Sequence, residues 1–275
     1  MAVVARLPHD WSHRRHTAGV PSARSLLFTV LGEFVLPGGG AAWSATLIRA
    51  LGALGVEEKA ARQAIARTAG DGWLASERSG RRVQWALTDA GHALLAAGAE
   101  RIYSFGGSQD DWDGRWVLLF VDDTNGDRER LRTRLAWAGF GRLRSGVWIA
   151  AHIERESEAQ DVLRGLGLDG ASFLASSGRI GDPSAVVGEA WELSALEDRY
   201  EDFISTFESV RPASPEHAFV ALTQLVHEWR KFPFLDPGLP SGLLPARWSG
   251  DRARKLFGDR RRNWAPRARR WFDSD

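Results

Sequence analysis

Apolar residues near the start of the chain recur every three or four positions, which is the period of amphipathic helices. Pro37 and the run Gly38-Gly39-Gly40 interrupt the pattern, as turn residues do. The spacing predicts four helices, over residues 22–36, 44–53, 57–69 and 88–103. Ser44 and Thr88 carry hydroxyl groups of the kind that cap helix N-termini, and we expect each to begin a helix.

Two short segments before the last of these helices have the period of β-strands. Strands are expected over residues 73–77 and 82–87, and in the second Val83, Trp85 and Leu87 alternate with polar or small side chains. Ser79-Gly80 should form the turn between them. Three helices followed by a hairpin is the order of a winged helix-turn-helix, a fold that reads DNA.

The pattern changes beyond the Gly- and Asp-rich segment SFGGSQDDWDGR, which predicts a domain boundary. Apolar strands and amphipathic helices then alternate. Their order is a strand in RWVLLFVDD, a helix in RERLRTRLAWAGF, one or two strands in GRLRSGVWIAAH, a helix in RESEAQDVLRGLG and a strand in ASFLASSGRIG. This βαββαβ order is that of a ferredoxin-like domain.

The last part of the chain has only helical periodicity. The apolar positions of its first two helices are Leu193, Leu196, Tyr200, Phe203, Ile204, Phe207, Phe219, Leu222, Leu225, Val226 and Trp229. A Pro-rich connector, FPFLDPGLPSGLLPARW, leads to a basic helix around residues 250–263. We therefore expect an α+β protein with a flexible tail (1–20), a winged-helix domain (21–105), a ferredoxin-like domain (112–182) and an all-helical domain (189–275).

Composition narrows the possible functions. The chain of 275 residues has no Cys, which excludes disulfides, thiol catalysis and zinc–thiolate sites. The longest apolar run, Leu26–Leu36, is broken by Gly32 and Glu33 and is too short to span a bilayer, and no secretory leader is apparent. We expect a cytoplasmic protein with no membrane association.

The net charge of +1 conceals an uneven distribution. Residues 1–105 hold 12 basic and 8 acidic side chains, a net charge of +4, whereas residues 106–188 hold 10 and 13, a net charge of −3. Residues 189–275 are balanced, with 14 of each. The positive excess therefore coincides with the predicted winged helix, where DNA phosphates would be bound.

The predicted helix 57–69 separates cleanly into two faces. At ~100° per residue, its inward face is expected to comprise Ala61, Ala64, Ile65 and Thr68. The opposite face carries the candidate DNA-reading residues Lys59, Arg62, Gln63 and Arg67, with Ala66 and Gly70. Arginine can bond guanine bidentately and glutamine can pair with adenine, so this face suits the major groove.

A solvated helix face would also explain such a basic stripe. The nearby hairpin argues against that interpretation, because its predicted tip carries Arg78, Arg81 and Arg82. Such arginines can bind phosphate or enter the minor groove. Together the two elements predict binding of double-stranded DNA, with a homodimer on an inverted-repeat operator.

The whole chain resembles the PaaX-type transcriptional repressors. The N-terminal segments ARSLLFTVLGEFV, DGWL and LTDAG match that family in order, as does RIY followed by WDGRW. The most specific matches are C-terminal: HEWR, LDPGLP and LLPARWSG. The resemblance implies a winged helix, a Cas2-like middle domain and a helical C-terminal domain. It also implies a dimeric repressor of phenylacetate-type catabolism that an aryl-CoA thioester, typically phenylacetyl-CoA, releases from DNA.

An aryl-CoA effector needs cations for its phosphates and an apolar slot for its acyl group. The candidates are Arg115, Trp116, Trp148, His227, Trp229 and Arg230. Structural roles compete with this assignment: the three tryptophans fit core positions, His227 could bond locally, and Arg230 could brace the LDPGLP turn through Asp236. No cofactor is otherwise expected.

The enzyme and scaffold alternatives have less support in the sequence. Asp122 and Asp123 end the first middle-domain strand, where a Cas2-like nuclease could bind a metal, but the turn-rich run Thr124-Asn125-Gly126 favours a simple turn. His9, His13 and His16 have no carboxylate or Cys to complete a metal site. No Ser-His-Asp, P-loop or GxGxxG motif is present, so we expect a regulator with no catalytic or metal residues. A non-DNA oligomeric scaffold that binds an acidic protein is the remaining alternative.

Overall fold

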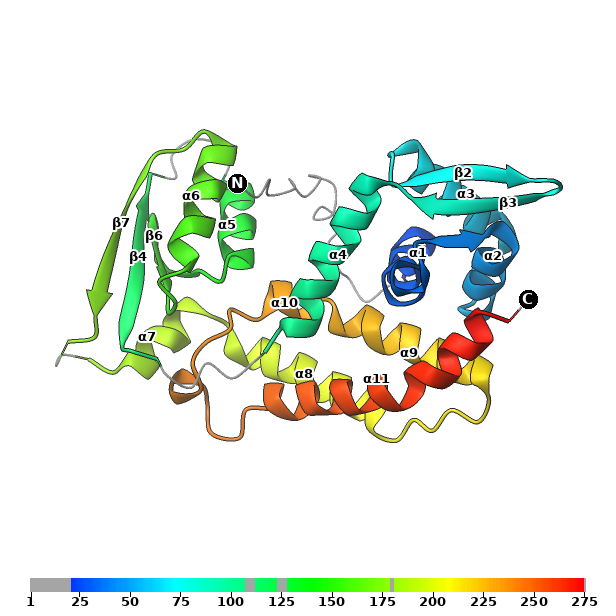
Figure 1. Ribbon diagram of the computed structural model, residues 1–275. Helices are drawn as coiled ribbons and strands as arrows, with labels where there is room; N and C mark the ends of the chain where they lie inside the picture. Colours follow the sequence, from blue (N-terminus) through cyan, green and yellow to red (C-terminus); the bar gives the residue numbers. More distant parts are fainter. Residues whose placement is uncertain (1–20, 107–111, 123–127, 179–180, 275) are drawn as a thin grey trace. The chain divides into compact units, whose positions relative to one another are not determined.

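A computed structural model describes residues 21–106, 112–122, 128–178 and 181–274, which fold as a mixture of helices and sheets (Figure 1). They form two compact units. Unit 1 comprises the described residues within 1–104, 209–229 and 257–275, and unit 2 those within 105–208 and 230–256. Both units therefore take helices from the C-terminal third of the chain. In the described ranges, no helix is long and apolar enough to cross a membrane.

Unit 1 is built around α1, whose residues Leu27 and Val30 have no exposed surface. Its helices are α1 (Ala23–Val30), α2 (Ser44–Ala53), α3 (Glu58–Gly70), α4 (Asp89–Ser104), α9 (Pro215–Trp229) and the later part of α11 (Gly250–Phe272). The expected single helix over 22–36 is instead α1, a π-helical turn at Leu31–Val35 and a 3-10 turn. The backbone thus changes its winding before Pro37.

The sheet of unit 1 has the order β1-β3-β2, with both pairs antiparallel. Its strands are β1 (Ala41–Trp43), β2 (Leu74–Ser79) and β3 (Arg82–Leu87). Strand β1 was not predicted, because three residues are too few to show a period. The turn lies one residue later than predicted, at Gly80-Arg81. Gly80 has φ 62°, the left-handed conformation that a type II′ hairpin favours at this place.

The two predicted caps differ in outcome. Thr88 accepts a hydrogen bond from the Gly91 N–H at 3.0 Å, as an N-cap of α4 does. The prediction for Ser44 was wrong, because Ser44 is the first residue within α2. Its hydroxyl accepts a hydrogen bond of 2.9 Å from the Trp85 indole instead, which ties α2 to β3.

A buried carboxylate joins three helical segments of unit 1. Glu33, 4% exposed, lies in the π-helical turn after α1. Its Oε1 accepts a hydrogen bond of 3.0 Å from Arg261 Nε of α11, and its Oε2 accepts one from the Tyr103 hydroxyl of α4. The Arg261 guanidinium lies 4.0 Å from the centre of the Tyr103 ring. Burial and the Glu33 carboxylate raise the pKa of Tyr103, so this phenol stays protonated.

Two further arginines attach α11 to the N-terminal helices. Arg269 donates to the Glu33 carbonyl at 3.1 Å. Arg49 of α2 donates to the Trp271 and Phe272 carbonyls at 3.1 and 3.0 Å, and it stacks over the Trp271 ring at 4.4 Å. Arg49 therefore satisfies carbonyl groups that the last turn of a helix leaves without partners.

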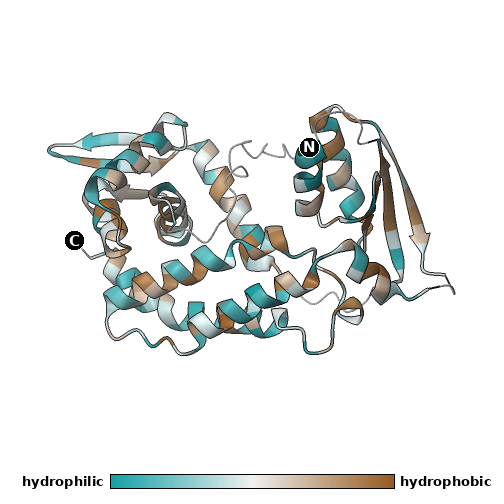
Figure 2. Cartoon of the chain, turned by 180° about the vertical axis from the view of Figure 1, so that it is seen from behind, coloured by the Kyte–Doolittle hydropathy of each residue, from teal (hydrophilic) through white to brown (hydrophobic). Residues whose placement is uncertain are grey.

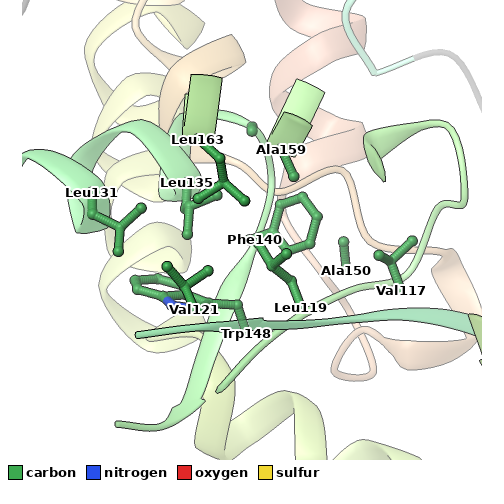
Figure 3. Close-up of a cluster of buried hydrophobic side chains, with 11 residues drawn as sticks. Val117, Leu119, Val121, Leu131, Leu135, Phe140, Trp148, Ala150, Ala159 and Leu163 are labelled. Atoms are coloured by element: carbon green, nitrogen blue, oxygen red, sulfur yellow. The ribbon is translucent and has the colours of Figure 1, made fainter. Parts of the chain in front are cut away.

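Unit 2 contains a four-stranded sheet of order β5-β6-β4-β7 in which all neighbours are antiparallel. Its chain order is β4 (Arg115–Val121), α5 (Arg128–Trp137), β5 (Gly141–Arg144), β6 (Val147–Ala150), α6 (Arg155–Leu166) and β7 (Gly170–Ser176). Helices α5 and α6 cover one face (Figure 1). The apolar core beneath them includes Leu135, Phe140 and Trp148 (Figure 3).

The remaining elements of unit 2 are helical and lie after β7. They are α7 (Pro183–Ala190), α8 (Leu193–Glu208), α10 (Phe232–Leu235), the 3-10 turn Ser241–Leu243 and the start of α11. The apolar positions predicted for residues 196–207 are buried on α8, and those of 219–229 are buried on α9. The final basic helix runs nine residues beyond its predicted end, through Pro266 to Phe272.

The LDPGLP segment is fixed by a buried acid. Asp236 accepts hydrogen bonds from the Tyr200 hydroxyl at 2.5 Å and from the Gly238 N–H at 2.7 Å. His152 Nε2 in turn donates to the Gly238 carbonyl at 2.7 Å. Burial raises the pKa of Asp236. The turn is therefore attached to both α8 and the loop after β6.

We predict that Arg261→Ala lowers the free energy of unfolding by about 2–3 kcal/mol, because it leaves the Glu33 carboxylate buried without its cation. Urea denaturation followed by circular dichroism would measure the change. Arg262→Ala is the matched control: this neighbour is 74% exposed and pairs with Asp259 within the helix, so a change within about 0.5 kcal/mol is expected. Equal losses in the two variants would contradict the role given to Glu33.

Candidate nucleic-acid interface

Helix α3 has the two faces that the sequence predicts. Its buried residues are Ala61, Ala64, Ile65 and Thr68, the four expected to point inward. The candidate reading residues Lys59, Arg62, Gln63 and Arg67 are all exposed. The inward face packs on α1 and α2, so the buried side of the helix fixes which side chains are presented to a partner.

Arg62 is not a free cation in this structure. Its Nε and Nη2 donate to Glu58 Oε1 at 2.9 and 2.6 Å, one helical turn earlier. Both side chains are more than 60% exposed. An exposed pair of this kind contributes only about 0.3–0.5 kcal/mol, so a guanine or a phosphate could draw the guanidinium away from Glu58.

The hairpin β2–β3 presents the second group of predicted residues. Arg78 lies in β2, Arg81 in the turn and Arg82 at the start of β3, and all three are exposed. Figure 2 shows hydrophilic colouring at the tip of this hairpin. The Arg82 guanidinium lies 5.9 Å from the Trp43 ring of β1, which gives that side chain a supporting surface.

The base of the hairpin is packed tightly against the helices. The Trp73 ring meets Phe28 of α1 edge-on, with centroids 6.0 Å apart. Gly91 of α4 lies so close to the Trp73 carbonyl that a Cβ there would be 2.2 Å from the oxygen. Arg24 of α1 forms an ion pair with Asp71, directly after α3. Helix α3 and the base of the hairpin therefore both pack against α1.

The six candidate effector residues are divided between the two units. His227 and Trp229 belong to unit 1, whereas the others belong to unit 2. In unit 1, His227 Nδ1 and the Thr29 hydroxyl share a hydrogen bond of 3.0 Å. The Trp229 indole donates to the Ile102 carbonyl at 3.2 Å and stacks on Phe257.

Within unit 2 the two tryptophans lie on opposite faces of the sheet. Trp148 belongs to the core beneath α5 and α6, whereas Trp116 belongs to the core of the other face and donates to the Ser177 hydroxyl at 2.8 Å. Arg115 is exposed and lowers the pKa of the Asp113 carboxyl through an ion pair. Arg230 is half-buried, directly after α9. A single pocket cannot include both tryptophans.

Unit 2 contains a cavity of about 500 Å³ that no sequence pattern indicated. It is formed by α7, the start of α8, and the end of the 3-10 turn with the chain that follows it. Its lining residues are Ser184, Val187, Gly188, Trp191, Glu192, Leu193, Ser194, Leu243, Leu244 and Pro245. Helix α7 was not predicted, and Leu244 and Pro245 come from a distant segment, so only the fold could assemble this cavity.

The structure adds little support to the metal-binding or nuclease alternatives. Asp122 follows β4 and is exposed, whereas Asp123, Thr124-Asn125-Gly126 and the histidines His9, His13 and His16 lie outside the described residues. Within the described ranges, no three His, Asp or Glu side chains form a group that could hold a metal ion.

Comparison with known proteins matches nearly the whole described chain. Three family models match it: "PaaX-like protein" over residues 22–91, "PaaX protein central Cas2-like domain" over 109–187 and "PaaX-like protein C-terminal domain" over 191–274. The transcriptional repressor PaaX of Escherichia coli (strain K12) is 32% identical over 254 residues, which are 86% of this chain and 78% of that protein. That relative is a regulator, as expected from the absence of enzyme motifs.

A solved structure extends the likeness in fold. The uncharacterized protein Rv0674 from Mycobacterium tuberculosis superposes with a TM-score of 0.63, at 24% identity, over 92% of this chain and 99% of that one. These matches define a class of proteins with three successive regions, of which the central one is Cas2-like. The chain belongs to the PaaX-like family.

Gly91→Ala is predicted to destabilise the protein by about 1–3 kcal/mol, since the added methyl group would overlap the Trp73 carbonyl at the base of the hairpin. Gly98→Ala in the same helix is the control, because its Cβ would meet no atom within 4 Å. Removing a helical glycine there should leave stability unchanged or raise it by up to about 1 kcal/mol. Urea midpoints compare the variants; a loss from Gly98→Ala as large as that from Gly91→Ala would refute the steric argument.

Proposed function

We propose that this protein is a DNA-binding transcriptional repressor whose α3 and β2–β3 hairpin act as the recognition helix and wing of a winged helix-turn-helix. The observation that carries the proposal is the division of α3: four buried residues fix its inner face, and four side chains suited to base edges are exposed on the other. Membership of the PaaX-like family supports the same function.

The element order supports the winged-helix assignment. Three helices precede a hairpin, and β1 adds a third strand to it. In this arrangement α3 would enter the major groove, while Arg78, Arg81 and Arg82 would contact the backbone or the minor groove. The βαββαβ order and the strand order of unit 2 support a ferredoxin-like middle domain.

We further propose that an aryl-CoA thioester, such as phenylacetyl-CoA, releases the protein from an operator of aromatic-acid catabolism. The cavity in unit 2, of about 500 Å³, is large enough for an aryl group, and Val187, Trp191 and Leu243 give it apolar walls. Arg115 and Arg230 remain candidates for the CoA phosphates. The operator itself is proposed to be an inverted repeat bound by a homodimer.

A mobility shift with genomic fragments tests the DNA-binding function directly. Specific retardation that survives an excess of random DNA is expected. Retardation that random DNA abolishes, or none at all, would contradict the proposal and leave the scaffold alternative. Magnesium-dependent cleavage of the same labelled duplex would favour a nuclease.

Arg62→Ala should cost roughly 1–3 kcal/mol of operator affinity and relax the preference at one base pair. Arg81→Ala should weaken operator and random DNA alike and flatten the dependence of affinity on salt. Fluorescence anisotropy on both DNAs at several salt concentrations would separate the two effects. If Arg62→Ala lowered the affinity for operator and for random DNA equally, α3 would not be the element that reads the base sequence.

Calorimetric titration with phenylacetyl-CoA is expected to detect binding by the wild type, and Gly188→Phe should abolish it by filling the cavity. Glu189→Phe is the matched control, since it adds the same ring one residue along α7 on a side chain outside the lining. Binding that persists in Gly188→Phe would place the effector elsewhere. A wild type that does not bind the thioester would contradict effector release by this compound.

A further inference from the structure

Glu58 is an acidic residue at the end of α3 where contact with base edges is expected. It is the first residue of the helix, and its carboxylate accepts two hydrogen bonds from Arg62, of 2.9 Å from Nε and 2.6 Å from Nη2. In helix-turn-helix proteins the N-terminal residues of the second helix contact the bases. The pair therefore lies where the sequence of the DNA would be read, although a carboxylate at that place repels phosphate.

The charge of the helix end explains only part of this arrangement. Acidic side chains are favourable at the N-terminus of a helix, and Glu57, directly before α3, is an exposed glutamate in the same position of advantage. Glu57 makes no side-chain hydrogen bond that caps the helix. Glu58 lies one helical turn before Arg62, which is the spacing of an ion pair on a helix surface. The contact with Arg62 thus distinguishes Glu58 from its neighbour.

The geometry of the pair leaves the outer end of the guanidinium for another partner. Glu58 Oε1 accepts from Nε and Nη2, which form one side of the group. Arginine has five N–H donors in a rigid fork, so Nη1 and Nη2 also carry parallel N–H groups at the outer end. These can donate to N7 and O6 of guanine, the two acceptors that arginine binds bidentately. Guanine can therefore bind Arg62 without displacing Glu58.

The pair also changes how Arg62 would respond to phosphate. Glu58 and Arg62 together carry no net charge, and both side chains are more than 60% exposed. A neutral pair adds little to the attraction between a protein and DNA of any sequence. The carboxylate also binds one side of the fork that a phosphate would use. Sequence-independent attraction would then come from Lys59, Arg67 and the hairpin arginines.

We propose that Glu58 is a specificity-determining residue, which positions Arg62 for guanine and disfavours the binding of that arginine to phosphate. The inference deepens the proposed function and rests on it, because it concerns how the repressor would distinguish its operator from other DNA. Glu58 acts through Arg62 and is therefore a positioning residue. Its carboxylate lowers the affinity for all DNA and raises the ratio of operator affinity to random-DNA affinity.

Duplexes that the wild-type protein selects from a randomised pool, and a random duplex of equal length, provide the test. In fluorescence anisotropy, Glu58→Ala should bind the random duplex more tightly, while the ratio of selected to random affinity falls about threefold, as loss of an exposed ion pair allows. Glu57→Ala is the matched control, since it removes the same charge one residue earlier and leaves the Arg62 pair intact. Both of its affinities should rise by the same factor, so that the ratio is unchanged.

The salt dependence is a readout that a change in helix stability would not move. Without Glu58, Arg62 can bind a phosphate, so the slope of log affinity against log salt concentration on random DNA should steepen by about 0.9. The slope should not change in Glu57→Ala, nor when Glu58→Ala is added to an Arg62→Ala variant. Circular dichroism of each variant checks that the helices are retained.

The outcomes separate this inference from the proposed function. A wild type that selects no sequence would contradict the repressor function and the role of Glu58 together. Suppose instead that the wild type selects a sequence and that Arg62→Ala relaxes one base preference, as the repressor function requires. An unchanged ratio in Glu58→Ala, or an equal fall in Glu57→Ala, would then overturn the role of Glu58 and leave the function standing. A fall caused by Glu58→Ala in the Arg62→Ala background would overturn it as well.

Discussion

Glu33 is a carboxylate with almost no access to water, and its pairing with Arg261 is the constraint on which unit 1 depends. Removing an ion from water costs several kcal/mol unless a partner of opposite charge and further hydrogen bonds replace the water. Arg261 of α11 and Tyr103 of α4 meet this requirement. The π-helical turn that carries Glu33 follows directly from α1, on which α3 packs. The position of α3 therefore depends on helices distant in the sequence.

Arginines have different surroundings in the interior of unit 1 and on the exposed face of α3 and the hairpin. In the helices of unit 1 other than α3, arginines such as Arg49 and Arg261 donate hydrogen bonds to carbonyl and carboxylate groups. On α3 and the hairpin, arginines are exposed and paired weakly or against an aromatic ring. A protein with a net charge of +1 can thus present a locally basic surface, because the charge of +4 on residues 1–105 is offset by −3 on residues 106–188.

The sequence predicted those features that depend on a regular period. The inward face of α3, the two hairpin strands and the apolar rows of α8 and α9 were each visible in residues three or four apart, or two apart. Features made by distant residues were not visible. Strand β1 exists because it pairs with β3. The Ser44 hydroxyl accepts a hydrogen bond from the Trp85 indole and does not cap its own helix. The cavity is lined by residues of α7 together with Pro245. The pairing of Arg62 with Glu58 could have been anticipated from its spacing of four residues.

The residue order of unit 1 has a consequence for the synthesis of the protein. Phe34 packs against Phe219 and Phe272, so the core of the first hundred residues is completed by side chains near the end of the chain. On the ribosome, these early helices must wait until almost the whole chain has been translated before they can bury that surface. Contacts so distant in sequence slow folding. Until then the nascent chain presents an apolar surface to chaperones, and no shortened N-terminal fragment would have a complete core.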